Sequence, residues 1–104
     1  MAFEIEVSEH AEHDINEAAS YIAKDSAARA KKWLIGLHSI FNSLQELPNH
    51  HSMIQEAEEL GRSLRSIIHH SHRIVYEVQE AANVVYIVRV YHGARHPLKE
   101  EDIS

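Results

Sequence analysis

The sequence contains no cysteine, and this absence removes several kinds of chemistry. Disulfides, thiol nucleophiles and cysteine-ligated zinc sites are all excluded. The longest apolar run, Val84–Val88, is far shorter than the roughly 18 residues of a membrane-spanning helix. The first residues carry no basic segment followed by an apolar one, so we expect no signal peptide and a cytoplasmic location.

Length and composition predict one globular domain over residues 1–104. The chain is 44% hydrophobic and 25% charged, as ordinary globular domains are. A chain of this size buries one modest core and has no room for a second domain or a large cofactor-binding fold. We therefore expect no cofactor.

Charge is distributed unevenly along the chain. The net charge is −6, which argues against a general nucleic-acid binder. Residues 1–60 carry −7, residues 61–98 carry +3, and the tail 99–104 carries −2. Every cation in residues 61–98 is arginine, whose planar fork suits contact with phosphate or carboxylate. Ten histidines are a second unusual feature.

The first part of the chain has the pattern of a strand followed by two helices. Apolar and acidic residues alternate near the start, which predicts a half-buried strand over residues 1–8. Apolar residues then recur every three or four positions over residues 9–47. Asp25 and Ser26 separate two helices in that segment, and Pro48 ends the second. So short a link predicts an antiparallel helix hairpin.

The second part of the chain has the pattern of a strand meander. Residues 48–63 are predicted to be a loop or, as an equal alternative, to contain a short helix over Ser52–Leu60 ended by Gly61. Three strand-like runs fill residues 64–92 before a tail over 93–104, namely Leu64–Ile68, Arg73–Gln79 and Val84–Tyr91. The predicted fold is α+β, with the helices on one face of a small antiparallel sheet.

Alternation along these runs predicts which side chains share the uncovered face of the sheet. That face would display one polar set: Arg65, His69, Arg73, Glu77, Arg89 and Tyr91. Its three arginines could anchor a phosphate or a target protein. They could instead pair locally, Arg73 with Glu77 and Arg89 with the acids of the first strand. Exposed ion pairs contribute only about 0–1 kcal/mol, so stability alone is a poor reason for three arginines there.

Five short motifs resemble the ParE/RelE superfamily of toxins from bacterial type II toxin–antitoxin modules. They are Ile5-x-Val7-Ser8-x-x-Ala11-x-x-Asp14-Ile15, Leu44-x-x-Leu47-Pro48, Leu64-Arg65-Ser66-Ile67, His72-Arg73-Ile74-Val75-Tyr76 and Val88-x-Val90-x-His92-Gly93-x-Arg95. Within the superfamily the motifs look more like the ParE branch, often labelled plasmid-stabilisation proteins. ParE-like toxins inhibit DNA gyrase, RelE-like toxins cut mRNA in the ribosome, and a cognate antitoxin silences both.

The resemblance implies a non-enzymatic gyrase inhibitor that forms a hetero-oligomer with its antitoxin and has no membrane partner. The implied target- or phosphate-binding residues are Arg65, Arg73, Arg89, Tyr91, His92 and Arg95. The alternative is a RelE-like, ribosome-dependent mRNA endoribonuclease with Arg65, Glu77 and His92 as its catalytic residues. The acidic net charge and the absence of lysine from residues 61–98 argue against that alternative. A third possibility is a non-toxic relic that only binds antitoxin.

The histidines allow catalytic and structural interpretations. His92 could accept the proton of a ribose 2′-hydroxyl near neutral pH, or it could simply lie where the last strand turns. His10 and His13 have the spacing of half a zinc site, and three further histidines at positions 69, 70 and 72 could supply ligands. No set of four ligands has convincing spacing, so we interpret the histidines as surface residues and expect no metal.

Overall fold

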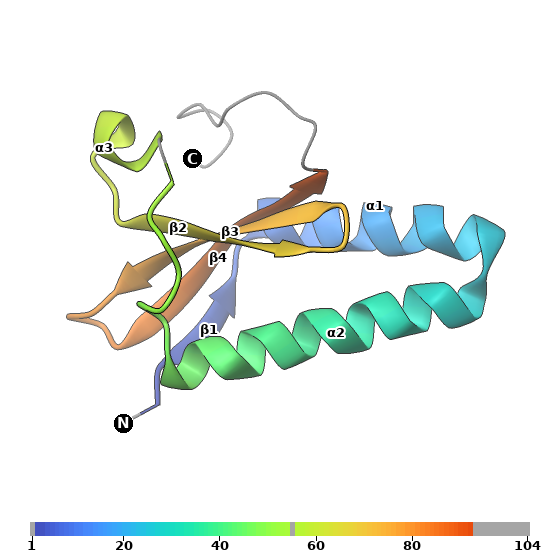
Figure 1. Ribbon diagram of the computed structural model, residues 1–104, viewed down its shortest axis with the longest axis horizontal. Coiled ribbons are helices and arrows are strands. Elements are labelled where there is room, and N and C mark those ends of the chain that lie inside the picture. The colour runs from blue at the N-terminus through green and yellow to red at the C-terminus, as the bar shows by residue number, and fades with distance from the viewer. Residues whose placement is uncertain (1, 55, 93–104) are drawn as a thin grey trace.

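The computed structural model describes residues 2–54 and 56–92. The elements are β1 (Glu4–Val7), α1 (Glu9–Asp25), α2 (Ala27–Glu46), α3 (Glu56–Leu60), β2 (Leu64–His69), β3 (His72–Gln79) and β4 (Val84–His92). Figure 1 shows α1 and α2 as a hairpin on one side of the sheet and α3 on the other. This order confirms the predicted α+β fold. No helix in the described part of the chain is long and apolar enough to cross a membrane.

Serine caps begin both long helices. The Ser8 hydroxyl accepts a hydrogen bond from the backbone N–H of Ala11 at 3.0 Å, and Ser26 does the same for Arg29 at 3.2 Å. Such caps satisfy N–H groups that have no partner within the helix. The second helix ends just before Pro48, because a residue preceding proline disfavours helical geometry.

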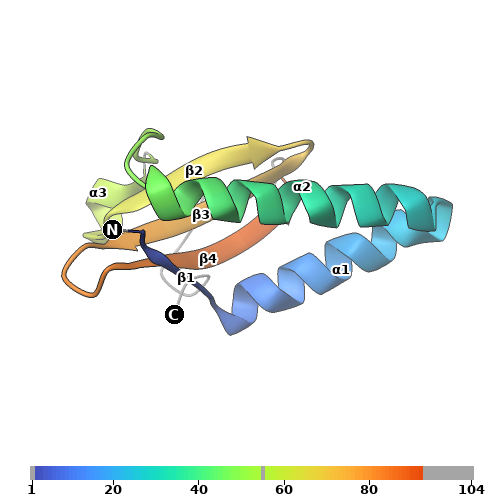
Figure 2. The ribbon, with the colours of Figure 1, turned by 90° about the horizontal axis from the view of Figure 1, so that it is seen from below.

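The sheet has the strand order β1-β4-β3-β2 and is mixed. β2, β3 and β4 form the predicted antiparallel meander, but β1 runs parallel to β4. The expectation of a wholly antiparallel sheet is therefore wrong. A tight turn forces neighbouring strands to be antiparallel, whereas β1 and β4 are separated by nearly the whole chain and are free of that constraint. Figure 2 shows α2 running across the sheet and α1 continuing from β1 alongside β4.

Both faces of the sheet carry an apolar cluster. On the face covered by α1 and α2, called the helix face, the buried residues are Ala11, Ala18, Trp33, Leu37, Phe41, Leu44, Ile74, Tyr76, Val78, Val85, Ile87 and Val90. On the opposite, far face, they are Ile54, Ala57, Leu64, Val75, Val88 and Tyr91. The far face is therefore partly covered by the segment around α3. α3 is a shorter form of the helix that the sequence allows over Ser52–Leu60. Gly61 follows it with a φ of +65°.

A β-bulge in β4 changes the predicted faces. Val75 pairs with Arg89, but the next residue, Tyr76, pairs with Ile87, so Val88 is an extra residue in β4. As a result Val88 lies in the far-face cluster, whereas Val90 lies in the helix-face cluster. Strict alternation would put Val88 and Val90 on one face, but alternation cannot anticipate an inserted residue.

The register of β2 places two predicted far-face residues on the helix face. Arg65 pairs directly with Tyr76, and His69 pairs with His72. Paired residues share a face, and Tyr76 belongs to the helix-face cluster. The predicted placement of Arg65 and His69 on the uncovered face is therefore wrong. Because both faces of β2 are partly covered, its apolar residues do not distinguish the two faces.

Candidate functional site

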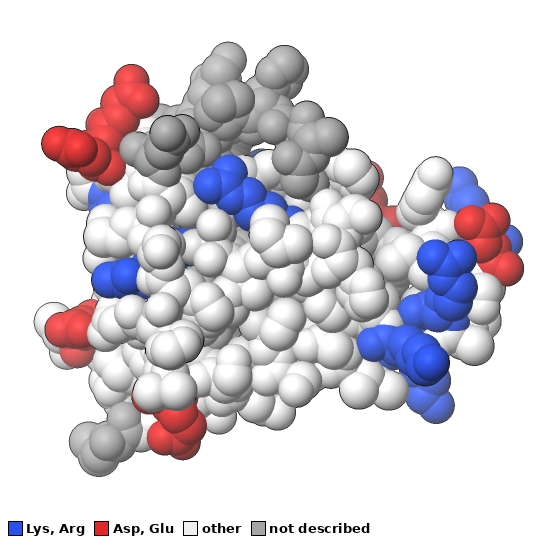
Figure 3. All heavy atoms as spheres, in the orientation of Figure 1, with Lys and Arg blue, Asp and Glu red and all other residues white. Residues whose placement is uncertain are grey.

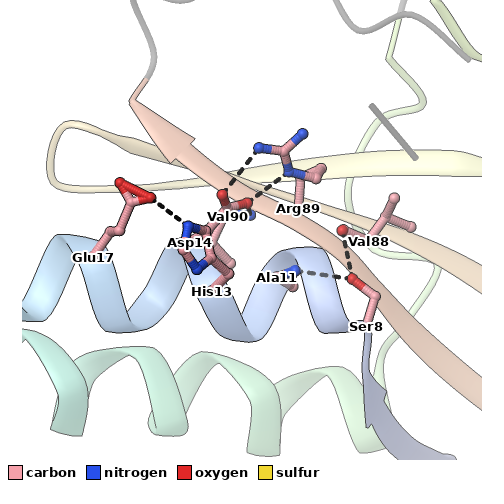
Figure 4. Close-up of polar contacts among 8 residues, drawn as sticks. All are labelled: Ser8, Ala11, His13, Asp14, Glu17, Val88, Arg89 and Val90. Carbon is pink, nitrogen blue, oxygen red and sulfur yellow. Dashed lines mark hydrogen bonds and ion pairs between the residues drawn. The ribbon is translucent and has the colours of Figure 1, made fainter. Parts of the chain in front are cut away.

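The start of α1 covers the part of β4 that extends beyond β1. The Ser8 backbone N–H donates to the Ile87 carbonyl oxygen at 2.9 Å, and the Ser8 hydroxyl donates to the Val88 carbonyl oxygen at 2.7 Å. Further along α1, Asp14 Oδ2 accepts a hydrogen bond from the Val90 N–H at 3.0 Å (Figure 4). These contacts satisfy backbone groups that an edge strand otherwise exposes.

Asp14 also holds Arg89 in a two-point ion pair, drawn in Figure 4. Arg89 Nε lies 2.7 Å from Asp14 Oδ2, and Arg89 Nη2 lies 2.9 Å from Asp14 Oδ1. The two side chains are only 12% and 9% exposed, so the pair is largely removed from water. The predicted pairing of Arg89 with the acids of the first strand is wrong, because those acids point to solvent. Sequence reasoning missed Asp14, although the residue stands in the first resembling motif.

Arg73 and Tyr91 meet on the far face, as predicted. Arg73 Nη1 donates to the Tyr91 hydroxyl at 3.0 Å. The predicted pairing of Arg73 with Glu77 is wrong, because Arg62 occupies that carboxylate through two hydrogen bonds of 2.9 Å. The hydrogen bonds from Arg62 lower the pKa of Glu77, and those same contacts raise the pKa of Arg62. Glu77 is therefore held as a carboxylate in a structural pair.

Arg65 lies beneath the segment that links α2 to α3. Its Nη1 donates to the His51 carbonyl oxygen, and its buried Nε has no hydrogen-bond partner among the described residues. The neighbouring Tyr76 hydroxyl donates to the Pro48 carbonyl oxygen at 2.9 Å. Burial raises the pKa of Tyr76 to about 12, so this hydroxyl keeps its proton. Arg65 is thus a positioned cation with unused donor capacity.

The three residues of the ribonuclease alternative are not brought together. Arg65 lies on the helix face, whereas Glu77 lies on the far face in its pair with Arg62. His92 pairs with His72 at the other end of β3, about 16 Å along the strand from Glu77. The remaining candidate, Arg95, lies outside the described residues.

A groove of about 950 Å³ opens between the helix hairpin and the end of the meander. Its lining comes from four places in the chain: His13, Asp14, Glu17, Ala18, Tyr21 and Ile22; Arg29, Lys32 and Trp33; His70–His72; and Arg89–His92. Figure 3 shows Lys and Arg gathered at the helix-hairpin end of the molecule. All four cations of residues 1–60 lie between Lys24 and Lys32, and all four are exposed.

Histidine rings cluster around Trp33 beside this groove. The His72 ring lies 5.2 Å from the Trp33 ring and 5.7 Å from the His92 ring. His69 Nε2 lies 2.9 Å from the Trp33 carbonyl oxygen, and His69 is only 9% exposed, so the interpretation of this histidine as a surface residue is wrong. Burial, followed by the nearby His92 and His69, lowers the pKa of His72. Within residues 2–54 and 56–92, no group of three potential ligands is placed to hold a metal ion.

The fold is shared with a protein of known structure. The chain is similar to a chain in the crystal structure of the toxin–antitoxin complex RelBE2 from Mycobacterium tuberculosis, with a TM-score of 0.59 and 18% identity. The match covers 88% of this chain and 99% of that one, and at this identity it establishes a shared fold.

The family follows from the sequence itself. The family model described as ParE toxin of type II toxin-antitoxin system, parDE, matches residues 5–97. The chain therefore belongs to the ParE toxin family, which confirms the resemblance carried by the five motifs. No curated protein matches the chain.

Proposed function

We propose that this ParE-family toxin acts in the bacterial cytoplasm by binding and inhibiting DNA gyrase, and that a cognate antitoxin neutralises it. Membership of the family supports the toxin role and the existence of an antitoxin. The structurally similar RelBE2 is itself a toxin–antitoxin complex, which is consistent with a hetero-oligomer.

The separation of Arg65, Glu77 and His92 is the observation that favours binding over RNA cleavage. General acid–base catalysis needs a proton acceptor within hydrogen-bond reach of the reacting group, together with a cation at the developing charge. Here the carboxylate of Glu77 is occupied by Arg62 and lies on the opposite face from Arg65. A protein that inhibits by binding needs no such convergence.

The proposed target contacts are Arg65, Arg73 and His92, and the two arginines are proposed for different reasons. Arg65 is a half-buried cation, and arginine is prominent among the residues that dominate binding energy at interfaces. Arg73 is oriented by the Tyr91 hydroxyl, so Tyr91 positions the cation. Arg89 differs from these, because Asp14 occupies its guanidinium and gives it a structural role.

Gyrase supercoiling assays and ribosome-dependent mRNA cleavage assays on the purified chain test the proposal. We expect inhibition of supercoiling, weakened roughly tenfold or more by Arg65→Ala and changed little by His92→Gln, because loss of one dominant contact costs that much binding. Lys31→Ala is the control for charge loss, since Lys31 is exposed on α2. Circular dichroism confirms that each variant is folded.

Other outcomes would overturn this function. Cleaved mRNA with unchanged supercoiling would establish the ribonuclease instead. Loss of toxicity in a folded His92→Gln protein that still binds antitoxin would also contradict a non-enzymatic mechanism. Antitoxin binding without any effect on growth would identify a non-toxic relic.

A further inference from the structure

The sheet has two outer strands, and they differ in how their open edges are protected. Figure 2 shows β1 and β2 at opposite sides of the sheet. An outer strand exposes unpaired N–H and C=O groups, and proteins usually protect such edges with charged side chains, proline, a bulge or a covering segment. β1 is only four residues long, and its Glu4 and Glu6 are exposed to solvent. The edge of β1 is therefore protected against pairing with another chain.

β2 has such protection only over its first half. The Ile54 N–H donates to the Leu64 carbonyl oxygen at 3.0 Å, and Met53 forms an isolated bridge with Arg65. Residues 66–72 contain no Asp, Glu, Lys, Arg or Pro. The β-bulge described above lies in β4 and does not alter this edge. The second half of β2 is therefore an unprotected edge.

The direction of the backbone groups identifies the residues that form this open edge. Successive residues of a strand point their N–H and C=O groups to alternate sides. Leu64 points its carbonyl away from β3 and toward Ile54, so Ser66 and Ile68 also point outward. In the described part of the chain, no backbone hydrogen bond reaches the outward groups of these two residues. The Ile68 side chain is 66% exposed, so apolar surface is accessible beside them.

This open edge is too short for most partners, but it matches itself. The segment leading into α3 closes one end, and the tight turn at His70 and Ser71 closes the other, so within β2 only Ser66 and Ile68 offer outward groups. A disordered peptide would gain few hydrogen bonds here and would lose conformational entropy on binding. A second copy of this chain brings an equally short edge that is already folded.

We propose that two copies of this chain associate through Ser66–Ile68, called the β2 edge, with their β2 strands antiparallel about a two-fold axis. Ser66 then forms a hydrogen-bonded pair with the partner's Ile68, and Ile68 does the same with the partner's Ser66. Ile67 lies on the axis and packs against the partner's Ile67. The two sheets become one continuous sheet. This association goes beyond the proposed function and does not depend on the toxin's target.

Sedimentation of the purified full chain at increasing concentration measures the association. We expect a reversible shift from monomer to dimer mass between roughly 10 µM and 1 mM, because so small an interface gives weak affinity. Ser66→Pro removes an outward N–H and no hydrogen bond of the β2–β3 ladder. This variant should dimerise at least roughly fivefold more weakly, because each copy loses one donor to its partner. Ser66→Ala, which keeps the N–H, is the matched control.

A second pair of variants tests the side chains of the edge. Ile68→Lys places a cation beside each end of the paired strands, which is a common protection of natural edges, and should weaken dimerisation at least roughly fivefold. Ile35→Lys is the matched control, because Ile35 is similarly exposed, at 60%, but lies on α2. Circular dichroism confirms that each variant is folded.

Single introduced cysteines report the register, because the chain has no cysteine of its own. Directly opposed residues in a non-hydrogen-bonded antiparallel pair have Cα atoms about 4.5 Å apart, which a disulfide can span. Ile67→Cys should therefore form an interchain disulfide with oxidised glutathione at least roughly tenfold faster than Ile35→Cys does. Non-reducing gel electrophoresis measures both rates.

Several results would overturn the inference. The chain could remain monomeric over the whole concentration range, Ser66→Pro could dimerise as well as Ser66→Ala, or Ile67→Cys could cross-link no faster than Ile35→Cys. A dimer that survives both Ser66→Pro and Ile68→Lys would place the contact between copies elsewhere and would also refute the β2 edge. The growth and supercoiling assays decide the proposed function separately.

Discussion

The pair formed by Asp14 and Arg89 yields a stability prediction whose size follows from its burial. Replacing Asp14 with alanine removes two charge-assisted hydrogen bonds to Arg89 and one to the Val90 N–H. It also takes the Asp14 carboxylate away from a guanidinium that is only 12% exposed. Removing one partner of a buried pair typically costs about 3–5 kcal/mol. That is a large share of the roughly 5–15 kcal/mol that stabilises a typical domain.

Thermal and urea unfolding followed by circular dichroism measure this loss. For a domain of this size each kcal/mol lowers Tm by about 4–8 °C, so Asp14→Ala should lower Tm by at least about 12 °C. Glu17→Ala is the matched control, because Glu17 pairs with His13 on the same helix but its side chain is 66% exposed. Exposed pairs contribute about 0–1 kcal/mol, so the control should unfold near the wild-type temperature.

A double-mutant cycle separates the pair from other effects of the substitution. Arg89→Met removes the cation that Asp14 holds, so the Asp14→Ala/Arg89→Met protein should be more stable than the sum of the single changes implies, by at least about 1.5 kcal/mol. Additive losses would refute the coupling between the two residues. A loss below about 1 kcal/mol for Asp14→Ala would refute the reasoning from burial.

Three further predictions concern packing, hydrogen bonding and pH. Gly36→Ala should destabilise by about 1–3 kcal/mol in urea unfolding, because its Cβ would lie 2.6 Å from His69 Cε1 and that ring is held by Trp33; an unchanged midpoint would contradict this packing. Tyr76→Phe should cost about 1–2 kcal/mol, because the buried Pro48 carbonyl loses its donor, and a neutral effect would show that another group or water replaces it. The lowered pKa of His72 favours the neutral ring in the folded state, so its contribution is fully present above the ordinary value of 6.5 and declines as the pH falls below it. Urea unfolding at pH 7.5 and 5.5 should show that decline, reduced in His72→Gln; equal declines in both proteins would assign it to other groups.

The helices could be predicted from the sequence because their signals are local. Apolar spacing, the serine caps and Pro48 each act within a few residues of the structure they determine. The strands themselves were predictable for the same reason. Their arrangement was less so, because β1 and β4 pair across nearly the whole length of the chain.

The site was only partly predictable, and the errors share a physical cause. Alternation correctly places Arg73 and Tyr91 on the same face of the sheet, because these two residues pair directly and the β-bulge lies elsewhere. It fails for Arg65, because β2 is buried against α2 on one face and against the α3 segment on the other. It also cannot find Asp14, whose role depends on α1 lying against the free edge of β4. Long-range packing decides these positions.

The parallel pairing of β1 with β4 has a consequence for the order in which the chain can fold during synthesis. The Ser8 hydroxyl bonds to a carbonyl 80 residues later in the sequence. Such distant contacts slow folding, because the loop between the partners must close before any of them forms. Until β4 leaves the ribosome, β1 and the apolar stripes of α1 and α2 lack the sheet against which they pack. The nascent chain therefore passes through most of its translation with this surface available to chaperones or to a binding partner already present in the cell.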